Sequence, residues 1–130
     1  MSGLIVELPS ELSSPGAARR ALGAELVGHG ISLDRPEVES AMLIISELVT
    51  NAIVHGASPI RMIVDIDEHR SLNLAVTDGA DEIPRLRCNP WAGQVGGWGM
   101  ELVDQVSLSW GVLPAPDDSA GKIVWAHLEL

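Results

Sequence analysis

Glu47, Asn51 and His55 are the residues of this chain whose types and spacing best suit binding or catalytic chemistry. They follow one another at i, i+4 and i+8, so on a helix they form a single row. An Asn carbonyl oxygen can bind a Mg²⁺ ion that takes its other ligands from water and from substrate phosphates. A nearby Glu can orient or deprotonate a hydroxyl that attacks a phosphoryl group. A solvated helix edge shows the same pattern, so the row alone does not establish a site.

A second candidate is Asp78, which ends an apolar run and is followed by Gly79. A buried carboxylate at this place can accept a hydrogen bond from an exocyclic amine such as that of adenine. Asp-Gly is also a common turn signal, and taken alone the pair is more typical of a turn at the end of a strand.

A third candidate is glycine-rich. Gly96, Gly97 and Gly99 surround Trp98 and lead directly into Met100, where a helical pattern begins. Glycines before a helix allow the backbone to approach a ligand closely, and the free N–H groups there suit a phosphate chain. Taken alone, a glycine cluster of this kind is a weak signal, because many such clusters are only loops.

The Glu47 row requires a helix, and the surrounding residues predict one. A broad apolar face lies beside the row at helical spacing, formed by Ala41, Met42, Ile45, Leu48, Val49, Ala52 and Ile53. We expect this helix to begin at a capping box formed by Asp34 and Glu37 and to end at Gly56.

The remaining elements follow from similar patterns. Ser14 at the N-cap and Pro15 at N1 begin a first helix that runs to about His29. A short helix is predicted over residues 100–106, and strands are predicted over residues 4–8, 60–66, 72–78, 107–112 and 122–130. Residues 79–97 are the one long irregular segment, and loops of this length are more often functional than not.

The order of these elements predicts the fold class. Helices come early and strands follow mostly in meander order, which is typical of an α+β fold and not of alternating βαβ units. We expect a two-layer sandwich in which a mixed, mostly antiparallel sheet carries helices on one face. Residues 1–130 are predicted to form a single domain whose core is mostly aliphatic, because the chain has no Phe or Tyr.

Composition narrows the classes of partner. The net charge of −10 disfavours a nucleic-acid-binding surface, although backbone amides and Mg²⁺ can still hold the phosphates of one nucleotide. Cys88 is the only cysteine, so no intrachain disulfide can form, which suits a reducing cytoplasm. We find no leader and expect no apolar run long enough to span a bilayer, so the predicted location is cytoplasmic.

Taken in order, these motifs resemble the GHKL superfamily, whose members share the Bergerat, or histidine-kinase-like, ATP-binding fold. In particular they resemble bacterial anti-sigma-factor serine kinases and the small ATP-binding regulatory proteins related to them. The likeness covers nearly the whole chain. Residues 45–56 are similar to the N box of these proteins, residues 97–104 to their last glycine box, and residues 109–112 and 121–125 to their last two strands.

The resemblance implies that ATP binds against the sheet and is held through Mg²⁺ by Asn51. It implies that Asp78 recognises adenine and that the run Gly96-Gly97-Trp98-Gly99-Met100 lies along the phosphates. Glu47 is the implied general base, which activates a serine hydroxyl of an anti-sigma-factor antagonist of the STAS type. The same protein is expected to sequester a sigma factor, and a homodimer is compatible with this assignment.

Some positions depart from the family pattern. The middle box of the family has glycines two and four residues after the Asp, whereas this chain has Ala80 and Glu82 there, with a glycine at Gly79. These departures favour an alternative function, a non-catalytic protein-binding module of the same fold with weak or no ATP binding. A detached histidine-kinase catalytic domain is a third interpretation, disfavoured by the short lid. Lys122, at the start of the final strand, is expected to face solvent.

Overall fold

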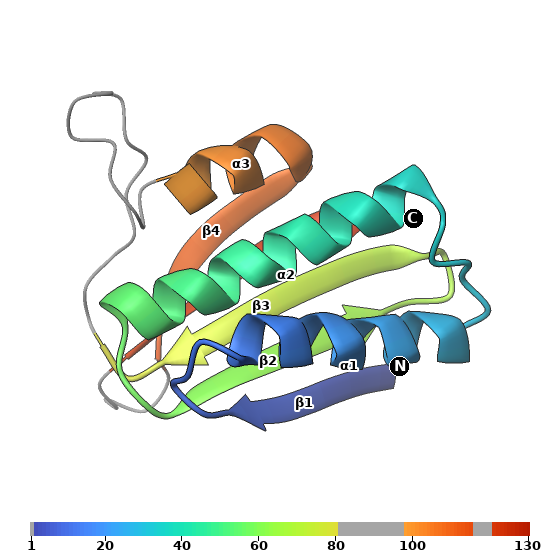
Figure 1. The fold of residues 1–130 in the computed structure, drawn as a ribbon. Coiled ribbons are helices and arrows are strands. Elements are labelled where there is room, and N and C mark those ends of the chain that lie inside the picture. The colour runs from blue at the N-terminus through green and yellow to red at the C-terminus, as the bar shows by residue number, and fades with distance from the viewer. Residues whose placement is uncertain (1, 81–97, 116–120) are drawn as a thin grey trace.

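The structure of the chain, a computed structural model, describes residues 2–80, 98–115 and 121–130. Figure 1 shows the order of the elements along the chain. They are β1 (Ser2–Leu8), α1 (Ser14–Gly28), α2 (Pro36–His55), β2 (Ile60–Ile66), β3 (Ser71–Asp78), α3 (Trp98–Val106), β4 (Ser109–Pro114) and β5 (Lys122–Glu129).

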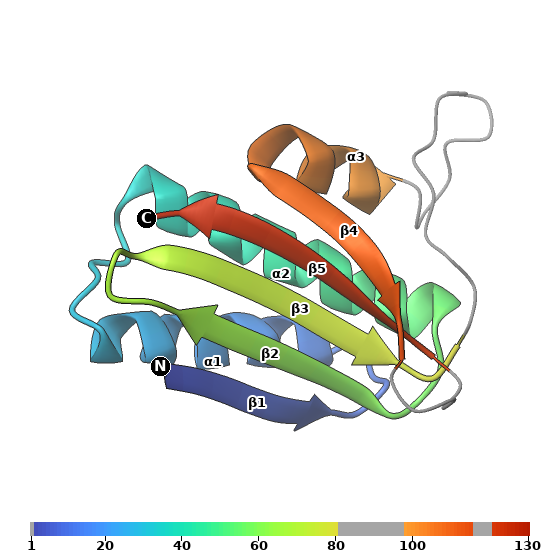
Figure 2. The ribbon, with the colours of Figure 1, turned by 180° about the vertical axis from the view of Figure 1, so that it is seen from behind.

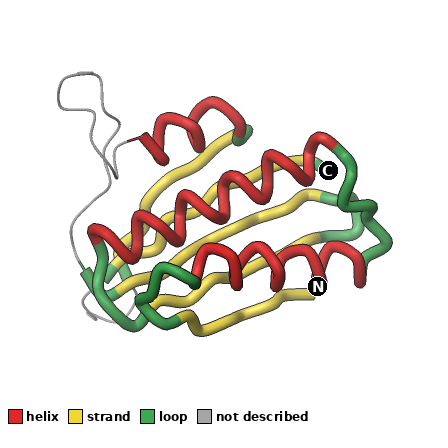
Figure 3. The backbone as a smooth tube through the Cα atoms, in the orientation of Figure 1, coloured by secondary structure: helices red, strands yellow, loops and turns green. Residues whose placement is uncertain are grey.

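The strands form one five-stranded sheet in the order β1-β2-β3-β5-β4, and each pair of neighbours is antiparallel. The helices form a layer on one face of this sheet, with α2 between α1 and α3 (Figures 1 and 3). No described element covers the opposite face, which Figure 2 shows from behind. The predicted α+β class, with a mostly antiparallel sheet and helices on one face, is therefore confirmed.

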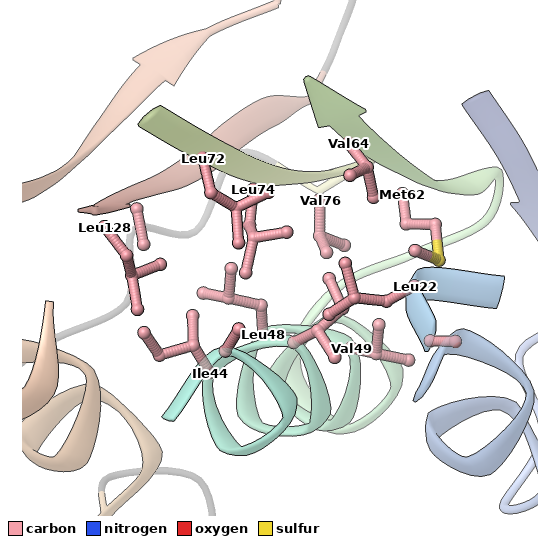
Figure 4. Close-up of a cluster of buried hydrophobic side chains, with 14 of the residues drawn as sticks. Leu22, Ile44, Leu48, Val49, Met62, Val64, Leu72, Leu74, Val76 and Leu128 are labelled. Carbon is pink, nitrogen blue, oxygen red and sulfur yellow. The ribbon is translucent and has the colours of Figure 1, made fainter. Parts of the chain in front are cut away.

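Alternation along the strands builds the core between the two layers. In β2, β3 and β5 every second side chain is buried against the helices, as expected for strands with one covered face. α2 supplies the opposing surface, and Figure 4 shows Ile44, Leu48 and Val49 pointing toward Leu74 and Val76 of the sheet. The core is aliphatic, as the composition predicts.

The two long helices begin at different residues from those that the sequence predicts. The N-cap of α1 is Ser13, because the hydroxyl of Ser14 donates to the carbonyl oxygen of Pro9. The capping box predicted at Asp34 is also wrong. Arg35 is the N-cap of α2 in an extended conformation, which the following Pro36 imposes on the residue before it.

α2 combines a core position with a composition typical of a membrane span. Among the described residues it is the one helix long and apolar enough to cross a bilayer, contrary to the expectation from the sequence that no run is long enough. Its buried side chains pack against the sheet and α1 in this structure, so the apolar composition of α2 contributes to the core.

We expect Ile44→Ala to lower the free energy of unfolding by about 2–5 kcal/mol, because the fully buried side chain leaves a cavity between α2 and the sheet. Val54→Ala, at an exposed position of the same helix, is the matched control. Urea unfolding followed by circular dichroism measures both variants. Equal losses for the two would contradict the packing described for α2.

Candidate functional site

The predicted site residues gather at one end of the molecule. The C-terminal end of α2, the C-terminal end of β3 and the N-terminal end of α3 all lie at this end (Figure 1). α2 carries Glu47, Asn51 and His55, β3 ends at Asp78, and α3 contains Met100. Gly56 follows α2 directly and lies against the carboxylate of Asp78, so the end of the helix that carries the first candidate meets the second candidate.

Asn51 is buried and has an unused hydrogen-bond donor. The residue is 8% exposed, and its Nδ2 is a buried atom that has no partner among the described residues. An unpaired buried polar group costs about 1–3 kcal/mol, so this amide is poised for an acceptor that the described residues do not supply. A phosphate oxygen can accept from Nδ2, and a Mg²⁺ ion can bind the amide oxygen, so the residue fits a Mg²⁺–phosphate group.

Glu47 lies one helical turn before Asn51 and is half-buried. Burial raises the pKa of its carboxyl above the ordinary value of 4.5, because water solvates the ionised form better than this site does. A carboxylate with a raised pKa is a stronger base, which suits a group that removes a proton from a hydroxyl.

Asp78 is held by a buried ion pair with Lys122. The Lys122 ammonium donates to Asp78 Oδ1 over 3.0 Å, and the two side chains are 7% and 2% exposed respectively. The ammonium also donates to the carbonyl oxygen of Ala80 at 3.3 Å, and the Ala80 N–H donates to the same Oδ1 at 2.8 Å. These contacts fix the Asp78 carboxylate in a buried position at the end of the sheet. In a simple turn the same carboxylate would be exposed to solvent.

Glycines are required where the backbone packs around this carboxylate. A Cβ at Gly56 would lie 2.6 Å from Asp78 Cγ, and a Cβ at Gly121 would lie 2.3 Å from the carbonyl oxygen of Asp78. Gly121 also has a φ of 122°, which residues with a side chain rarely adopt. The backbone of Gly56 is extended and not left-handed. A glycine is therefore required at this position because there is no room for a side chain, and not because of the backbone conformation.

The expectation that Lys122 faces solvent is wrong. Lys122 is paired directly with Asp78 in the register of β3 and β5, so both side chains point toward the helix layer. The sequence feature that indicates the burial of Lys122 is the alternation in β5, where Lys122 is in phase with the buried Val124 and Ala126. The ion pair of Lys122 and the close packing of Gly56 and Gly121 around Asp78 are thus features of the site that the sequence did not predict.

The glycine-rich candidate is described only in part. Gly96 and Gly97 lie outside the described residues. α3 begins at Trp98, two residues before the predicted start, so Trp98 and Gly99 belong to its first turn. Met100 is fully buried, and its side chain belongs to the core. The first backbone N–H groups of a helix have no partner within it and suit an anion.

No group of three or more His, Cys, Asp or Glu side chains in the described ranges is arranged to hold a metal ion. A Mg²⁺ ion at this site would therefore depend on Asn51, water and the phosphates of a nucleotide. A ligand set of this kind is typical of Mg²⁺.

Comparisons with known proteins identify the fold. No protein-family model and no curated protein sequence matches the chain. The RsbU and RsbW domains of Rv1364c from Mycobacterium tuberculosis align with a TM-score of 0.71 and 16% identity, over 100% of this chain and 33% of that one. The histidine kinase domain of a blue-light activated histidine kinase from Erythrobacter litoralis aligns with a TM-score of 0.52 and 23% identity, over 72% and 45%.

The chain thus spans less than half the length of either structure. The likeness concerns the fold alone, and it confirms the predicted α+β, histidine-kinase-like architecture.

We expect Lys122→Met to lower the free energy of unfolding by about 3–5 kcal/mol, because it leaves the Asp78 carboxylate buried without its cation. Asp78→Asn should cost a similar amount by leaving the ammonium unpaired. The double variant should lose less than the sum of the two, which a double-mutant cycle from urea unfolding measures. Additive losses would mean that the two side chains do not interact.

We expect Glu47→Gln to raise the free energy of unfolding at about pH 7 and to leave it unchanged at about pH 4. The raised pKa means that the ionised carboxylate is less favourable in the folded chain than in the unfolded chain, so it costs stability as the pH rises above 4.5. Glu39→Gln, at an exposed position of the same helix, is the control. A gain that is equal at both pH values would contradict this assignment.

Proposed function

We propose that this chain binds ATP with Mg²⁺ and is a regulatory protein kinase of the anti-sigma-factor type, which phosphorylates a serine of a STAS-type antagonist and sequesters a sigma factor. The observation that carries the proposal is the buried amide of Asn51, which has an unused donor, one turn from a carboxylate whose pKa is raised. The GHKL-type fold and the family likeness of residues 45–56 support the same assignment.

The proposed chemistry is the transfer of the terminal phosphoryl group of ATP to a serine hydroxyl. Glu47 accepts the proton of the hydroxyl while the serine oxygen forms a bond to the γ-phosphorus. The bond between that phosphorus and the bridging oxygen breaks, and ADP leaves. Asn51 would hold the Mg²⁺ ion, which would supply positive charge to neutralise the phosphates, and the first turn of α3 would lie along them. Glu47 and Asn51 share one helix, so their spacing is fixed.

Asp78 is the proposed acceptor for the exocyclic amine of adenine. Lys122 and the Ala80 N–H both donate to Oδ1. Oδ2 is the atom proposed to contact the base. Lys122 acts as a positioning residue in this scheme, because it fixes the orientation of the carboxylate.

A second candidate function is a protein-binding module of the same fold that binds ATP weakly or not at all. The buried ion pair favours it, because Lys122 already satisfies part of the carboxylate that would recognise adenine. Ala80 and Glu82, which replace glycines of the family pattern, favour it as well. Such a module would hold a sigma factor or a STAS protein without transferring phosphate.

Titration calorimetry with ATP and Mg²⁺ separates the two functions. We expect the wild-type chain to bind ATP only with Mg²⁺, and Asn51→Ala to weaken this binding by about tenfold or more, or about 1.4 kcal/mol. Gln105→Ala, which removes an exposed amide from α3, is the control and should bind as the wild type does. No binding of millimolar ATP by the wild type would reject the kinase and leave the second candidate.

Phosphotransfer tests the role of Glu47 in a chain that binds ATP. Radiolabelled ATP and a purified STAS-domain antagonist serve as substrates, and the labelled residue is identified by mass spectrometry. We expect serine phosphorylation by the wild type and a loss of about a hundredfold or more in Glu47→Gln, with ATP binding retained. Undiminished transfer by Glu47→Gln would rule out a general base at this position.

A further inference from the structure

A groove of about 700 Å³ lies on the exposed side of the helix layer, between α1 and α2. The two helices lie side by side and run in opposite directions (Figures 1 and 3). On α1 the lining residues recur at helical spacing from Gly16 to Val27, a length of about 16 Å at 1.5 Å per residue. The volume falls within the roughly 300–1,000 Å³ of small-molecule sites. None of the described residues that line the groove belongs to the candidate nucleotide site.

The floor of the groove is apolar and partly uncovered. It consists of Gly23, Ala24, Val27, Leu33 and Met42. Val27 is 57% exposed and Leu33 is 45% exposed. Apart from two arginines, no described residue of the lining has a polar side chain, so a peptide laid in the groove would find no partners there for its amide groups. An aliphatic chain has no such groups, and the floor therefore favours it.

The glycine at position 23 deepens this floor. A Cβ at Gly23 would lie 3.4 Å from Met42 Cε and 3.6 Å from Leu33 Cδ1, which are ordinary van der Waals distances. The packing of α1 therefore does not require a glycine here, and a glycine in the interior of a helix is less favourable than an alanine. The space that a side chain would fill is left open to a ligand.

Two arginines converge at the end of the groove near the start of α1. A Cβ at Gly16 would lie 3.5 Å from both Arg19 Nη2 and Arg20 Nη1, so the two guanidinium groups flank one point. Neither arginine forms an ion pair with a described carboxylate, and no described residue of the lining is acidic. The chain has 18 acidic and 8 basic residues, so two cations without a counter-ion are an exception on its surface. Like charges that converge in this way favour an anion between them.

Contacts with α2 hold Arg19 in this orientation. Arg19 Nη1 donates to Ser46 Oγ at 2.8 Å, and the Ser46 hydroxyl donates to the carbonyl oxygen of Met42 at 2.8 Å. Nη2, the atom near Gly16, is then available to an anion. A planar guanidinium matches the two oxygens of a carboxylate, and an arginine that is already fixed loses less conformational freedom on binding.

We propose that this groove binds a long-chain carboxylic acid, with the carboxylate between Arg19 and Arg20 and the aliphatic tail along the floor toward Val27. The two ends of the groove match the two parts of such a ligand, because one end has convergent cations and the other has no polar side chain. The net charge of −10 disfavours anions over most of the surface, so charge complementarity confines the carboxylate to this end.

Titration calorimetry with dodecanoate, below its critical micelle concentration and without nucleotide, tests the site. We expect one dodecanoate to bind per chain, and octanoate to bind at least about tenfold more weakly, because four fewer methylene groups are buried. The double variant Arg19→Gln with Arg20→Gln should weaken dodecanoate binding by about tenfold or more, because the carboxylate loses both cations. Gly23→Leu should abolish binding by filling the groove.

Each variant has a matched control outside the groove. Arg61→Gln removes an exposed arginine from the opposite face of the sheet. Gly28→Leu adds the same side chain to α1 at a position where no described atom lies within 4 Å of a Cβ. Both controls should bind dodecanoate as the wild type does. Circular dichroism establishes that every variant is folded.

The absence of saturable dodecanoate binding by the wild type would overturn the proposal and leave the groove to another protein. Binding that survives Gly23→Leu, or that does not respond to the loss of both arginines, would place the ligand elsewhere and overturn it as well. Because nucleotide is absent throughout, neither result depends on the function proposed above.

Discussion

The buried ion pair between Asp78 and Lys122 fixes the end of the fold at which the candidate site lies. It joins the last residue of β3 to the first residue of β5 on the covered face of the sheet. Two charges taken out of water are costly unless their geometry and remaining hydrogen bonds are favourable. The backbone of Ala80 supplies further bonds, and Gly56 and Gly121 let the chain close around the carboxylate. The close approach of the C-terminal end of α2 to Asp78 therefore depends on Gly56, which has no side chain.

α2 serves both the core and the candidate site, and the two roles oppose each other energetically. Its buried aliphatic face stabilises the fold, while the unused Asn51 amide and the desolvated Glu47 carboxylate each cost stability. A helix that had the polar row but lacked the aliphatic face would not fold against the sheet. Such costs are typical of functional residues, which are held in place by the packing of the rest of the element. Asn51 of this row is therefore buried, unlike a residue of the solvated helix edge that the sequence alone allows.

The sequence predicts the elements and the fold class because hydrophobic period is a local signal. The strands at residues 60–66 and 72–78 and the long helix follow from alternation and from helical spacing. The first residues of the helices are predicted less well, because Pro36 and the Ser14 hydroxyl compete with the predicted caps. The burial of Lys122 is not predicted by the sequence for a different reason. Its partner lies 44 residues away, and only the register of β3 with β5 brings the two together.

The sheet keeps its uncovered face physically apart from the candidate site. Successive side chains of a strand point to opposite faces, so Asp78 and Lys122 face the helices while their neighbours Thr77 and Ile123 face outward. A substitution on the uncovered face thus changes no side chain of the candidate site, although the two lie one residue apart on β3 and on β5. Substitutions on the uncovered face and substitutions at the candidate site can therefore be tested separately, and any dependence of one on the other would have to be transmitted through these two strands.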